Sequence, residues 1–125
     1  MNVPSNLRYT QDHEWAGKDE NLLTIGITDF AQSELGDIVF IELPAIGTHF
    51  AANDVFGTVE AVKAVSELFM PVAGTIVAVN DALNNSPEEV NSSPYDKGWM
   101  IKIEPDNMAD WDALMSADDY TAAVS

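Results

Sequence analysis

Lys63 is the residue whose type and surroundings point most directly to chemistry. It is one of five basic residues in the chain, and it stands where two strand-like runs meet within residues 55–70. The β-branched, aromatic and other apolar residues on both sides suit a pleated, half-buried hairpin. A lysine at the tip of that hairpin offers a primary amine to a modifying enzyme. This geometry suggests a swinging-arm attachment site, although the spacing alone favours an ordinary solvated turn lysine.

Modification by another enzyme suits Lys63 better than catalysis. A lysine amine is a poor nucleophile near neutral pH because it is protonated, and only burial or a cationic neighbour would favour its neutral form. The nearest charged residues in the sequence are Glu60 and Glu67, and both favour the ammonium ion. We therefore expect Lys63 to be a substrate of another protein.

Other kinds of site lack the residues that they need. The chain has no cysteine, which excludes disulfides, thiolate catalysis and cysteine-based zinc sites. His13 and His49 are far apart in sequence and stand in no recognisable triad or metal-binding spacing. The aspartates near the C-terminus lack the loop of a calcium site, and there is no glycine-rich phosphate loop. We expect no bound metal, while a Ser–His pair assembled by the fold stays open.

Composition limits the partners of the protein. The 125 residues, 46% of them hydrophobic, are enough for a single domain over 1–125. With 21 acidic and 5 basic residues the net charge is −16. Such a surface repels nucleic acid and anionic membranes and suits partners with basic docking faces. No apolar run is long enough for a membrane span, and the N-terminus resembles neither a signal nor a transit peptide. We predict a cytoplasmic monomer.

Periodicity and turn residues predict a mainly β chain with short helices. The expected strands cover 7–9, 22–27, 37–43, 75–80 and 99–103, with a polar turn at 17–21 and strand-and-turn character at 47–54. Thr28 or Asp29 is expected to cap a helix over 30–35 that Gly36 ends. Further short helices are predicted from Ser86, over 108–115 and over 117–123.

Segments 47–54 and 74–81 form an internal repeat. Gly, Thr, Ala, Asn and Asp recur in register, at 47/74, 48/75, 51/78, 53/80 and 54/81. A duplication of this kind predicts two small antiparallel sheets related by a pseudo-twofold axis, with the Lys63 hairpin at one end of a flattened barrel. Similar turn chemistry on unrelated strands is the alternative explanation of the matches.

The run Val-Glu-Ala-Val-Lys-Ala at 59–64 resembles the lipoyl-attachment hairpin of the glycine cleavage system H protein family. All biotinyl and lipoyl domains share this hairpin, but further motifs extend the resemblance to essentially the whole chain. They are His-Glu-Trp at 13–15, Gly-Ile-Thr at 26–28, Leu-Gly-Asp at 35–37, Pro-Val-Ala-Gly at 71–74, Asn-Ser-Ser-Pro-Tyr at 91–95 and Gly-Trp-Met at 98–100. The resemblance implies a barrel-sandwich hybrid with short helices, including C-terminal ones.

The resemblance also implies a function. Lys63 would carry lipoic acid in an amide bond, attached by a lipoyl ligase or transferase for which Glu60, Val62 and Ala64 are recognition candidates. The lipoyl arm would shuttle the aminomethyl group from glycine decarboxylase, the P protein, to the aminomethyltransferase, the T protein. Dihydrolipoyl dehydrogenase, the L protein, would reoxidise the arm. The chain itself would be a carrier and not an enzyme.

A cleft that receives the loaded arm is a further implication of the resemblance. Glu14 in the His-Glu-Trp motif resembles the acidic cleft residue of the family, and Glu67 is the second acidic candidate. The apolar candidates are Ile27, Phe30 and Ala31. The chain departs from the family pattern at Ala61, where Ser is frequent, and at Phe30, where His is frequent. Both departures bear on arm docking rather than on attachment.

Two alternatives stay open. The first is a lipoyl or biotinyl domain of another complex. Biotin carriers place Met on both sides of the lysine, whereas this chain has Val62 and Ala64, and the Pro/Ala-rich linker usual after lipoyl domains of 2-oxoacid dehydrogenases is absent. The second is an H-like protein that acts as an unmodified interaction module or relays its lipoyl group to other enzymes. The intact mass of the protein distinguishes a modified from an unmodified Lys63.

Overall fold

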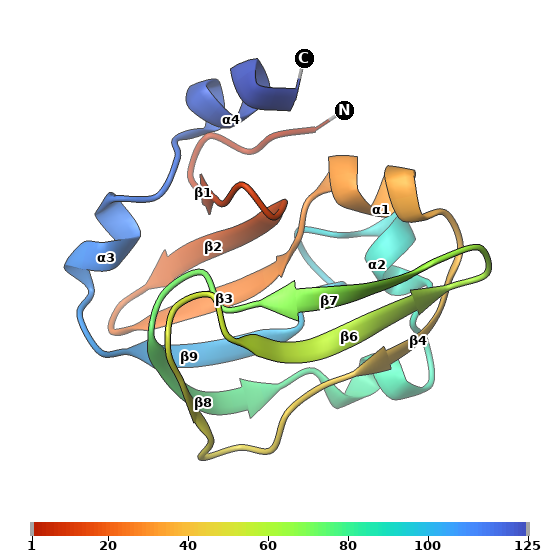
Figure 1. Ribbon diagram of the computed structural model, residues 1–125, viewed down its shortest axis with the longest axis horizontal. Coiled ribbons are helices and arrows are strands. Elements are labelled where there is room, and N and C mark those ends of the chain that lie inside the picture. The colour runs from red at the N-terminus through yellow and green to blue at the C-terminus, as the bar shows by residue number, and fades with distance from the viewer. Residues whose placement is uncertain (1, 125) are drawn as a thin grey trace.

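Two antiparallel sheets make up most of the protein (Figure 1). The computed structural model describes residues 2–124. The larger sheet has six strands in the order β1-β2-β3-β9-β8-β5, and the smaller has three in the order β4-β6-β7. The predicted mainly β fold with two antiparallel sheets and short helices is therefore confirmed. The repeat did not predict that the two sheets would differ in size.

The larger sheet is built from β1 (Arg8–Tyr9), β2 (Glu14–Asp19), β3 (Leu22–Ile27), β5 (His49–Phe50), β8 (Gly74–Val79) and β9 (Ile101–Pro105). The predicted polar turn at 17–21 is too long. Gly17 and Lys18 remain in β2 because they pair with Thr24 and Leu23 of β3, so that only residues 20–21 turn. The final strand begins two residues later than predicted.

The smaller sheet contains the hairpin around which the site is built. It consists of β4 (Ile38–Glu42), β6 (Val55–Ala61) and β7 (Val65–Phe69). β6 is the central strand and pairs antiparallel with both neighbours. The two strand-like runs of 55–70 thus form β6 and β7, and residues 62–64 connect them, as the sequence predicted.

The core lies between the two sheets. Leu23, Ile25 and Ile103 of the larger sheet and Val59 and Leu68 of the smaller are each at most 2% exposed and belong to one apolar cluster. They alternate with more exposed residues along their strands, because successive side chains of a strand point to opposite faces. Burying each large apolar side chain contributes about 1.5–3 kcal/mol relative to leaving it in water.

The short helices are α1 (Asp29–Leu35), α2 (Glu89–Ser92), α3 (Ala109–Asp112) and α4 (Ala117–Val124), with a 3₁₀ turn η1 over Asp81–Asn84. The predicted start of α1 is confirmed, since the Thr28 hydroxyl accepts a hydrogen bond from the backbone N–H of Ala31. Gly36 ends the helix with φ of 79°, a value that glycine adopts without the strain of a side chain. Among residues 2–124, no helix combines the length and apolar content of a membrane span.

Two predicted helices differ from the structure. The helix expected from Ser86 begins at Glu89, because the preceding turn is closed by i→i−3 bonds, from the Glu89 N–H to the Ser86 carbonyl and from the Val90 N–H to the Pro87 carbonyl. The helix expected over 108–115 is shorter in the structure, where α3 covers only Ala109–Asp112. Met115 cannot continue it because its N–H and C=O both pair with Tyr9 of β1, at 2.9 Å each.

The two copies of the internal repeat lie side by side. β5 comes from the first copy and β8 from the second, and they pair antiparallel, with His49 opposite Thr75 and Phe50 opposite Gly74. An antiparallel pair has a local twofold axis between its strands. The repeat thus lies within the larger sheet rather than contributing one copy to each sheet.

A second, aromatic cluster joins the two ends of the chain. Tyr9, Trp15 and Tyr120 are at most 2% exposed and bring together β1, β2 and α4. Figure 1 shows α4 and both termini on the same side of the larger sheet. The C-terminal helix therefore packs against the N-terminal strands, close to the start of β2.

Candidate functional site

Lys63 lies in the exposed turn between β6 and β7. The turn is closed by a hydrogen bond from the Ala61 N–H to the Ala64 carbonyl, at 2.7 Å. A second bond, from the Val62 N–H to the Asp37 carbonyl at 3.0 Å, ties the turn to the segment that follows α1. The hairpin end seen at the right of Figure 1 is thus a fixed platform for an accessible amine.

The Lys63 side chain points back over the end of α1. A β-carbon built on Gly36 would lie 3.3 Å from Lys63 Cε and 3.8 Å from Nζ. Leu35, the residue before Gly36, lines a cleft. The lysine stem therefore lies beside the residue that directly follows Leu35 of that cleft.

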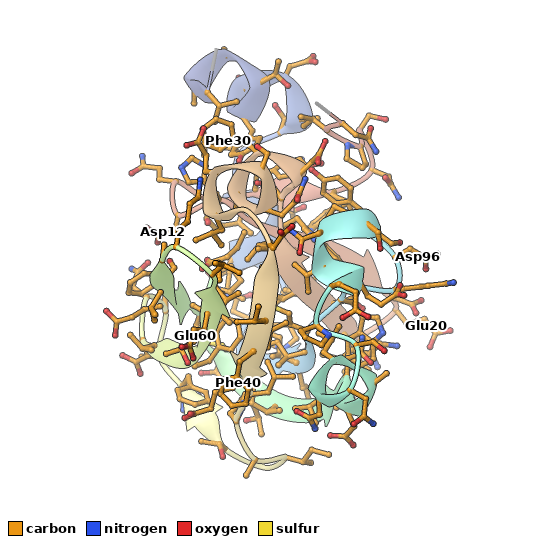
Figure 2. The ribbon with its side chains drawn as sticks, turned by 90° about the vertical axis from the view of Figure 1, so that its right-hand side faces the viewer. Asp12, Glu20, Phe30, Phe40, Glu60 and Asp96 are labelled. Carbon is orange, nitrogen blue, oxygen red and sulfur yellow. The ribbon has the colours of Figure 1, made fainter. Side chains whose placement is uncertain are left out.

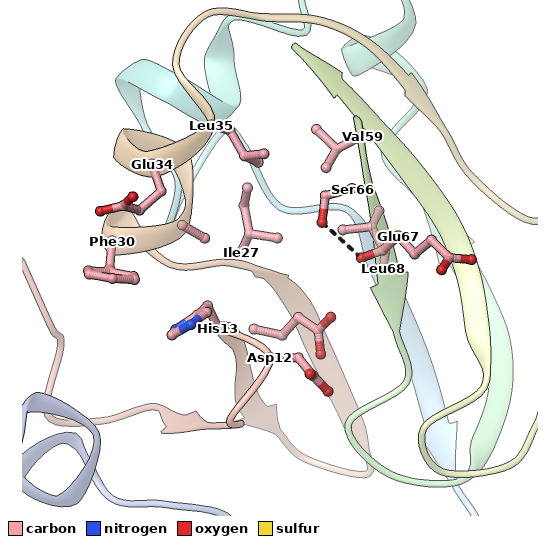
Figure 3. Close-up of a pocket in the computed structure, with 12 residues that line it drawn as sticks. Asp12, His13, Ile27, Phe30, Glu34, Leu35, Val59, Ser66, Glu67 and Leu68 are labelled. Atoms are coloured by element: carbon pink, nitrogen blue, oxygen red, sulfur yellow. Dashed lines mark hydrogen bonds between the residues drawn. The ribbon is translucent and has the colours of Figure 1, made fainter. Parts of the chain in front are cut away.

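The cleft has a volume of about 400 Å³ and lies between α1, the start of β2 and the β6–β7 hairpin (Figure 3). Its lining residues, here called the acidic cleft, are Asp12, His13, Glu14, Ile27, Phe30, Ala31, Glu34, Leu35, Val59, Ser66, Glu67 and Leu68. This set includes all five residues that the sequence nominated for arm docking: Glu14, Glu67, Ile27, Phe30 and Ala31. The fold brings them together from three separate segments.

Glu14 is the buried carboxyl of the acidic cleft. Its side chain is only 1% exposed. Oε2 accepts a hydrogen bond from the Phe69 N–H at 2.8 Å, and Oε1 accepts one from the Thr10 hydroxyl at 3.3 Å. Burial raises the pKa of Glu14 to about 8, and the bond from Phe69 opposes that rise. Glu14 is therefore a largely neutral carboxyl at pH 7, and a nearby cation would lower its pKa and favour the carboxylate.

Three further carboxyl side chains line the acidic cleft: Asp12, Glu34 and Glu67. All three are exposed, and Figure 3 shows the Glu67 carboxylate directed away from Ile27 and Leu35. No Lys or Arg is among the lining residues within the described part of the chain. The electrostatic potential of the cleft thus favours a cation near its buried carboxyl.

Apolar side chains form the opposite wall. Ile27 ends β3 and is 3% exposed, and Phe30 and Leu35 come from α1. The Phe30 ring packs on the imidazole of His13, with ring centroids 4.8 Å apart. This wall suits the apolar part of a ligand, so the cleft fits a flexible hydrocarbon chain that ends in a cationic group.

The recognition candidates Glu60, Val62 and Ala64 lie outside the acidic cleft. Glu60 is on the exposed face of the smaller sheet, where it pairs with Phe40 of β4 and Val65 of β7. Figure 2 shows the Phe40 and Glu60 side chains on this outer face. Val62 is 76% exposed and Val65 67%, so apolar groups and a carboxylate surround the lysine turn on its outer side.

Sequence reasoning missed several cleft residues, above all Asp12, His13 and Glu34. His13 has φ of 66°, and its ring lies beside Phe30. No local pattern in the sequence predicted this left-handed backbone conformation. Glu34 lies one helical turn after Phe30, and this spacing puts both residues on one side of α1. The spacing could therefore have predicted Glu34 as a cleft residue. Within residues 2–124, no three His, Asp or Glu side chains are grouped in a way that could bind a metal ion.

Comparisons with known proteins identify the family of this chain. A family model described as glycine cleavage H-protein matches residues 7–125. A glycine cleavage system H protein of Geobacillus thermodenitrificans is 57% identical over 125 residues, which cover 100% of this chain and 98% of the relative. The corresponding protein of Anoxybacillus flavithermus is 55% identical with the same coverage.

A solved structure shows that the fold also matches that of an H protein. The crystal structure of a glycine cleavage system H protein from Mycobacterium marinum superposes with a TM-score of 0.90 at 34% identity, covering 98% of each chain. The fold expected from the resemblance is thereby confirmed. The chain therefore belongs to the glycine cleavage H-protein family, and it is a carrier of the glycine cleavage system rather than an enzyme.

Proposed function

We propose that Lys63 is the residue that carries lipoic acid, in an amide bond to its Nζ. The observation that carries this proposal is the position of the Lys63 amine. It is exposed in a fixed turn, and its stem lies over Gly36, which directly follows Leu35 of a cleft with a buried carboxyl. Ser66 of the cleft is three residues from Lys63, a separation that spans at most about 10 Å even in a fully extended chain. A long arm on Lys63 can therefore enter the acidic cleft or extend into solvent.

The bound group supplies a dithiolane that takes up an aminomethyl group on reduction and is later reoxidised. The P protein would load the arm, the T protein would unload it and the L protein would reoxidise it. The protein's own contribution is to shield and release the arm. The net charge of −16 supports contacts with basic faces of these enzymes. A cytoplasmic location and a monomeric state remain parts of this proposal.

The acidic cleft receives the arm when the arm bears a positive charge. The apolar wall of Ile27, Phe30 and Leu35 accepts the hydrocarbon chain, and Glu14 pairs with the ammonium. An ammonium next to Glu14 favours the carboxylate over the neutral acid. The carboxyl of Glu14 without a docked arm has a pKa of about 8. Docking of the arm near pH 7 therefore releases a proton from Glu14, and Glu14 takes up a proton again when the arm leaves the cleft.

Intact mass tests the attachment. The chain is incubated with lipoate, ATP and a lipoyl ligase, and its mass is compared with that of untreated protein. We expect one lipoyl increment in the native chain and in Lys97→Arg, a matched exposed lysine, and none in Lys63→Arg. An increment that persists in Lys63→Arg contradicts the assignment. No increment in any chain supports instead the alternative of an unmodified interaction module.

Docking is tested by capping the reduced arm. Its thiols are alkylated either with 2-bromoethylamine, which leaves a cationic aminoethyl group, or with iodoacetamide, which leaves a neutral amide. NMR of the Ile27 methyl groups reports whether the arm is in the cleft. We expect the aminoethyl arm to shift these signals and the neutral arm to leave them close to those of the unmodified chain. Equal spectra for the two arms contradict docking that depends on charge.

A further inference from the structure

The side chain of Tyr120 connects the C-terminal helix α4 to the walls of the acidic cleft. Its ring is 1% exposed and stacks on Tyr9, with centroids 4.8 Å apart and planes at 14°. The Tyr120 hydroxyl lies 2.9 Å from His13 Nδ1 and 2.8 Å from Thr28 Oγ1. One buried hydroxyl thus bonds the side chains of two residues whose backbones are already joined, since the Thr28 N–H donates to the His13 carbonyl at 3.0 Å.

Both partners of this hydroxyl belong to the frame of the cleft. The His13 ring lines the cleft and packs on Phe30. Thr28 caps α1, since its hydroxyl accepts from the Ala31 N–H and its carbonyl accepts from the Gln32 N–H. α1 in turn supplies the apolar wall. The backbone bond from Thr28 to His13 sets the spacing of the two segments, whereas the orientation of the His13 ring and of the Thr28 hydroxyl depends on what their side chains contact.

The Tyr120 hydroxyl connects Thr28 and His13 whichever way the two hydrogen bonds run. In one direction Thr28 donates to Tyr120, and Tyr120 donates to His13 Nδ1, which leaves the proton on Nε2. In the other, His13 Nδ1–H donates to Tyr120, and Tyr120 donates to Thr28. Each direction requires one tautomer of His13. Without the hydroxyl, both His13 Nδ1 and the Thr28 hydroxyl lose a bond, and the imidazole can turn against Phe30.

We propose that Tyr120 is a positioning residue for the acidic cleft, holding the His13 ring and the Thr28 cap of α1 in the orientation that a docked arm needs. Tyr120 is not among the residues that line the cleft in the described chain, so it acts through His13 and Thr28. The proposal rests on the proposed docking of the lipoyl arm. It assigns to α4 a part in arm docking in addition to packing against the N-terminal strands.

The test compares two single-hydroxyl deletions in the lipoylated, reduced and aminoethyl-capped chain. Tyr120→Phe keeps the stacked ring and removes the bridging hydroxyl. Tyr9→Phe is the matched control, because its hydroxyl belongs to the same cluster but donates to the Pro4 carbonyl at 2.6 Å, away from the cleft. The docked-to-free ratio of the arm, read from the Ile27 methyl signals, should fall about threefold to tenfold in Tyr120→Phe and stay unchanged in Tyr9→Phe.

A second readout follows the histidine and would not respond to a general loss of packing. The ¹⁵N shifts of the His13 ring report its tautomer. They should change in Tyr120→Phe and remain native in Tyr9→Phe, both in the lipoylated and in the unmodified chain. Thermal unfolding of all three proteins verifies that the comparison is made between folded chains.

The outcomes separate this inference from the function on which it rests. If the native chain itself shows no docking of the aminoethyl arm, the docking proposal fails, and the role of Tyr120 fails with it. If the native chain docks the arm and Tyr120→Phe docks it equally well, only the role of Tyr120 is overturned. An equal loss in Tyr120→Phe and Tyr9→Phe also overturns it, because the loss then reflects packing of the aromatic cluster.

Discussion

Lys63 lies over Gly36 in the space that a side chain at residue 36 would enter. A β-carbon there would be 3.3 Å from Lys63 Cε, so the absence of a side chain leaves the lysine stem a path across the end of α1. Gly36 also has φ of 79°, which disfavours any other residue. The same glycine thus ends the helix and clears the route from the hairpin to the acidic cleft.

Replacing Gly36 by Ala should both destabilise the protein and hinder docking of the arm. Backbone strain at positive φ predicts a loss of about 1–3 kcal/mol in the free energy of unfolding, measured by urea denaturation. The matched control is Gly47→Ala, since Gly47 has φ of 94° but a β-carbon added to it would meet no atom within 4 Å. Both variants should lose stability, but only Gly36→Ala should lower the docked fraction of the aminoethyl arm. Equal docking in the two variants would contradict the path across Gly36.

Glu14 should make the stability of the unmodified chain depend on pH. Burial raises its folded-state pKa to about 8 from an ordinary value of 4.5. The folded state therefore binds the proton more tightly than the unfolded state, and the stability that this provides is fully present below about pH 4.5 and is lost as pH rises toward 8. Glu14→Gln keeps a neutral group and should remove this component.

Urea titrations at pH 5.5 and pH 8.5 measure the effect. The free energy of unfolding of the native chain should fall between them by about 1–3 kcal/mol more than that of Glu14→Gln. Glu60→Gln, a change at an exposed carboxylate, controls for the loss of one acid and should follow the native chain. A Glu14→Gln profile parallel to the native one would show that Glu14 titrates normally in the folded protein.

Glu60 should contribute to the rate of lipoylation without contributing to stability. It lies between Phe40 and Val65 on the exposed face beside the lysine turn. Reversing its charge in Glu60→Lys should slow the ligase reaction about tenfold, since charges at the edge of an interface act mainly on association. Glu104→Lys, an equal reversal on an exposed residue of β9, is the control and should react at the native rate. Equal rates in both variants would exclude Glu60 as a recognition residue.

Gly26 should be required for packing of Trp15. A β-carbon at Gly26 would lie 2.8–2.9 Å from three atoms of the indole, whose N–H donates to the Pro94 carbonyl at 3.0 Å. Gly26→Ala should therefore lower the free energy of unfolding by about 1–3 kcal/mol, measured by denaturation followed through tryptophan fluorescence. Thr24→Ala, in the same strand but partly exposed, should cost less. If Gly26→Ala has the same free energy of unfolding as the native chain, the Trp15 indole can shift to accept a β-carbon, and Gly26 is not required for its packing.

Features that depend on neighbours in the chain were predictable. The β6–β7 hairpin, its lysine turn and the Thr28 cap of α1 each follow from contacts between residues at most 14 positions apart. One prediction failed because of a distant partner: the helix over 108–115 stops early because Met115 pairs with Tyr9. The polar turn at 17–21 failed for a local reason, since β2 extends past Gly17 through pairs with β3 that are only three to seven positions apart.

The position at which an arm could be attached follows from the sequence alone, because a turn lysine between two strands is a local property. The tertiary structure decided what surrounds it. Glu14, the α1 wall and β7 come from distant segments, and only their packing buries the Glu14 carboxyl and raises its pKa. The bond from Tyr120 to His13 spans 107 positions and leaves no local pattern. Burial and long-range hydrogen bonds depend on which segments the fold places together, so the cleft became visible only with the structure.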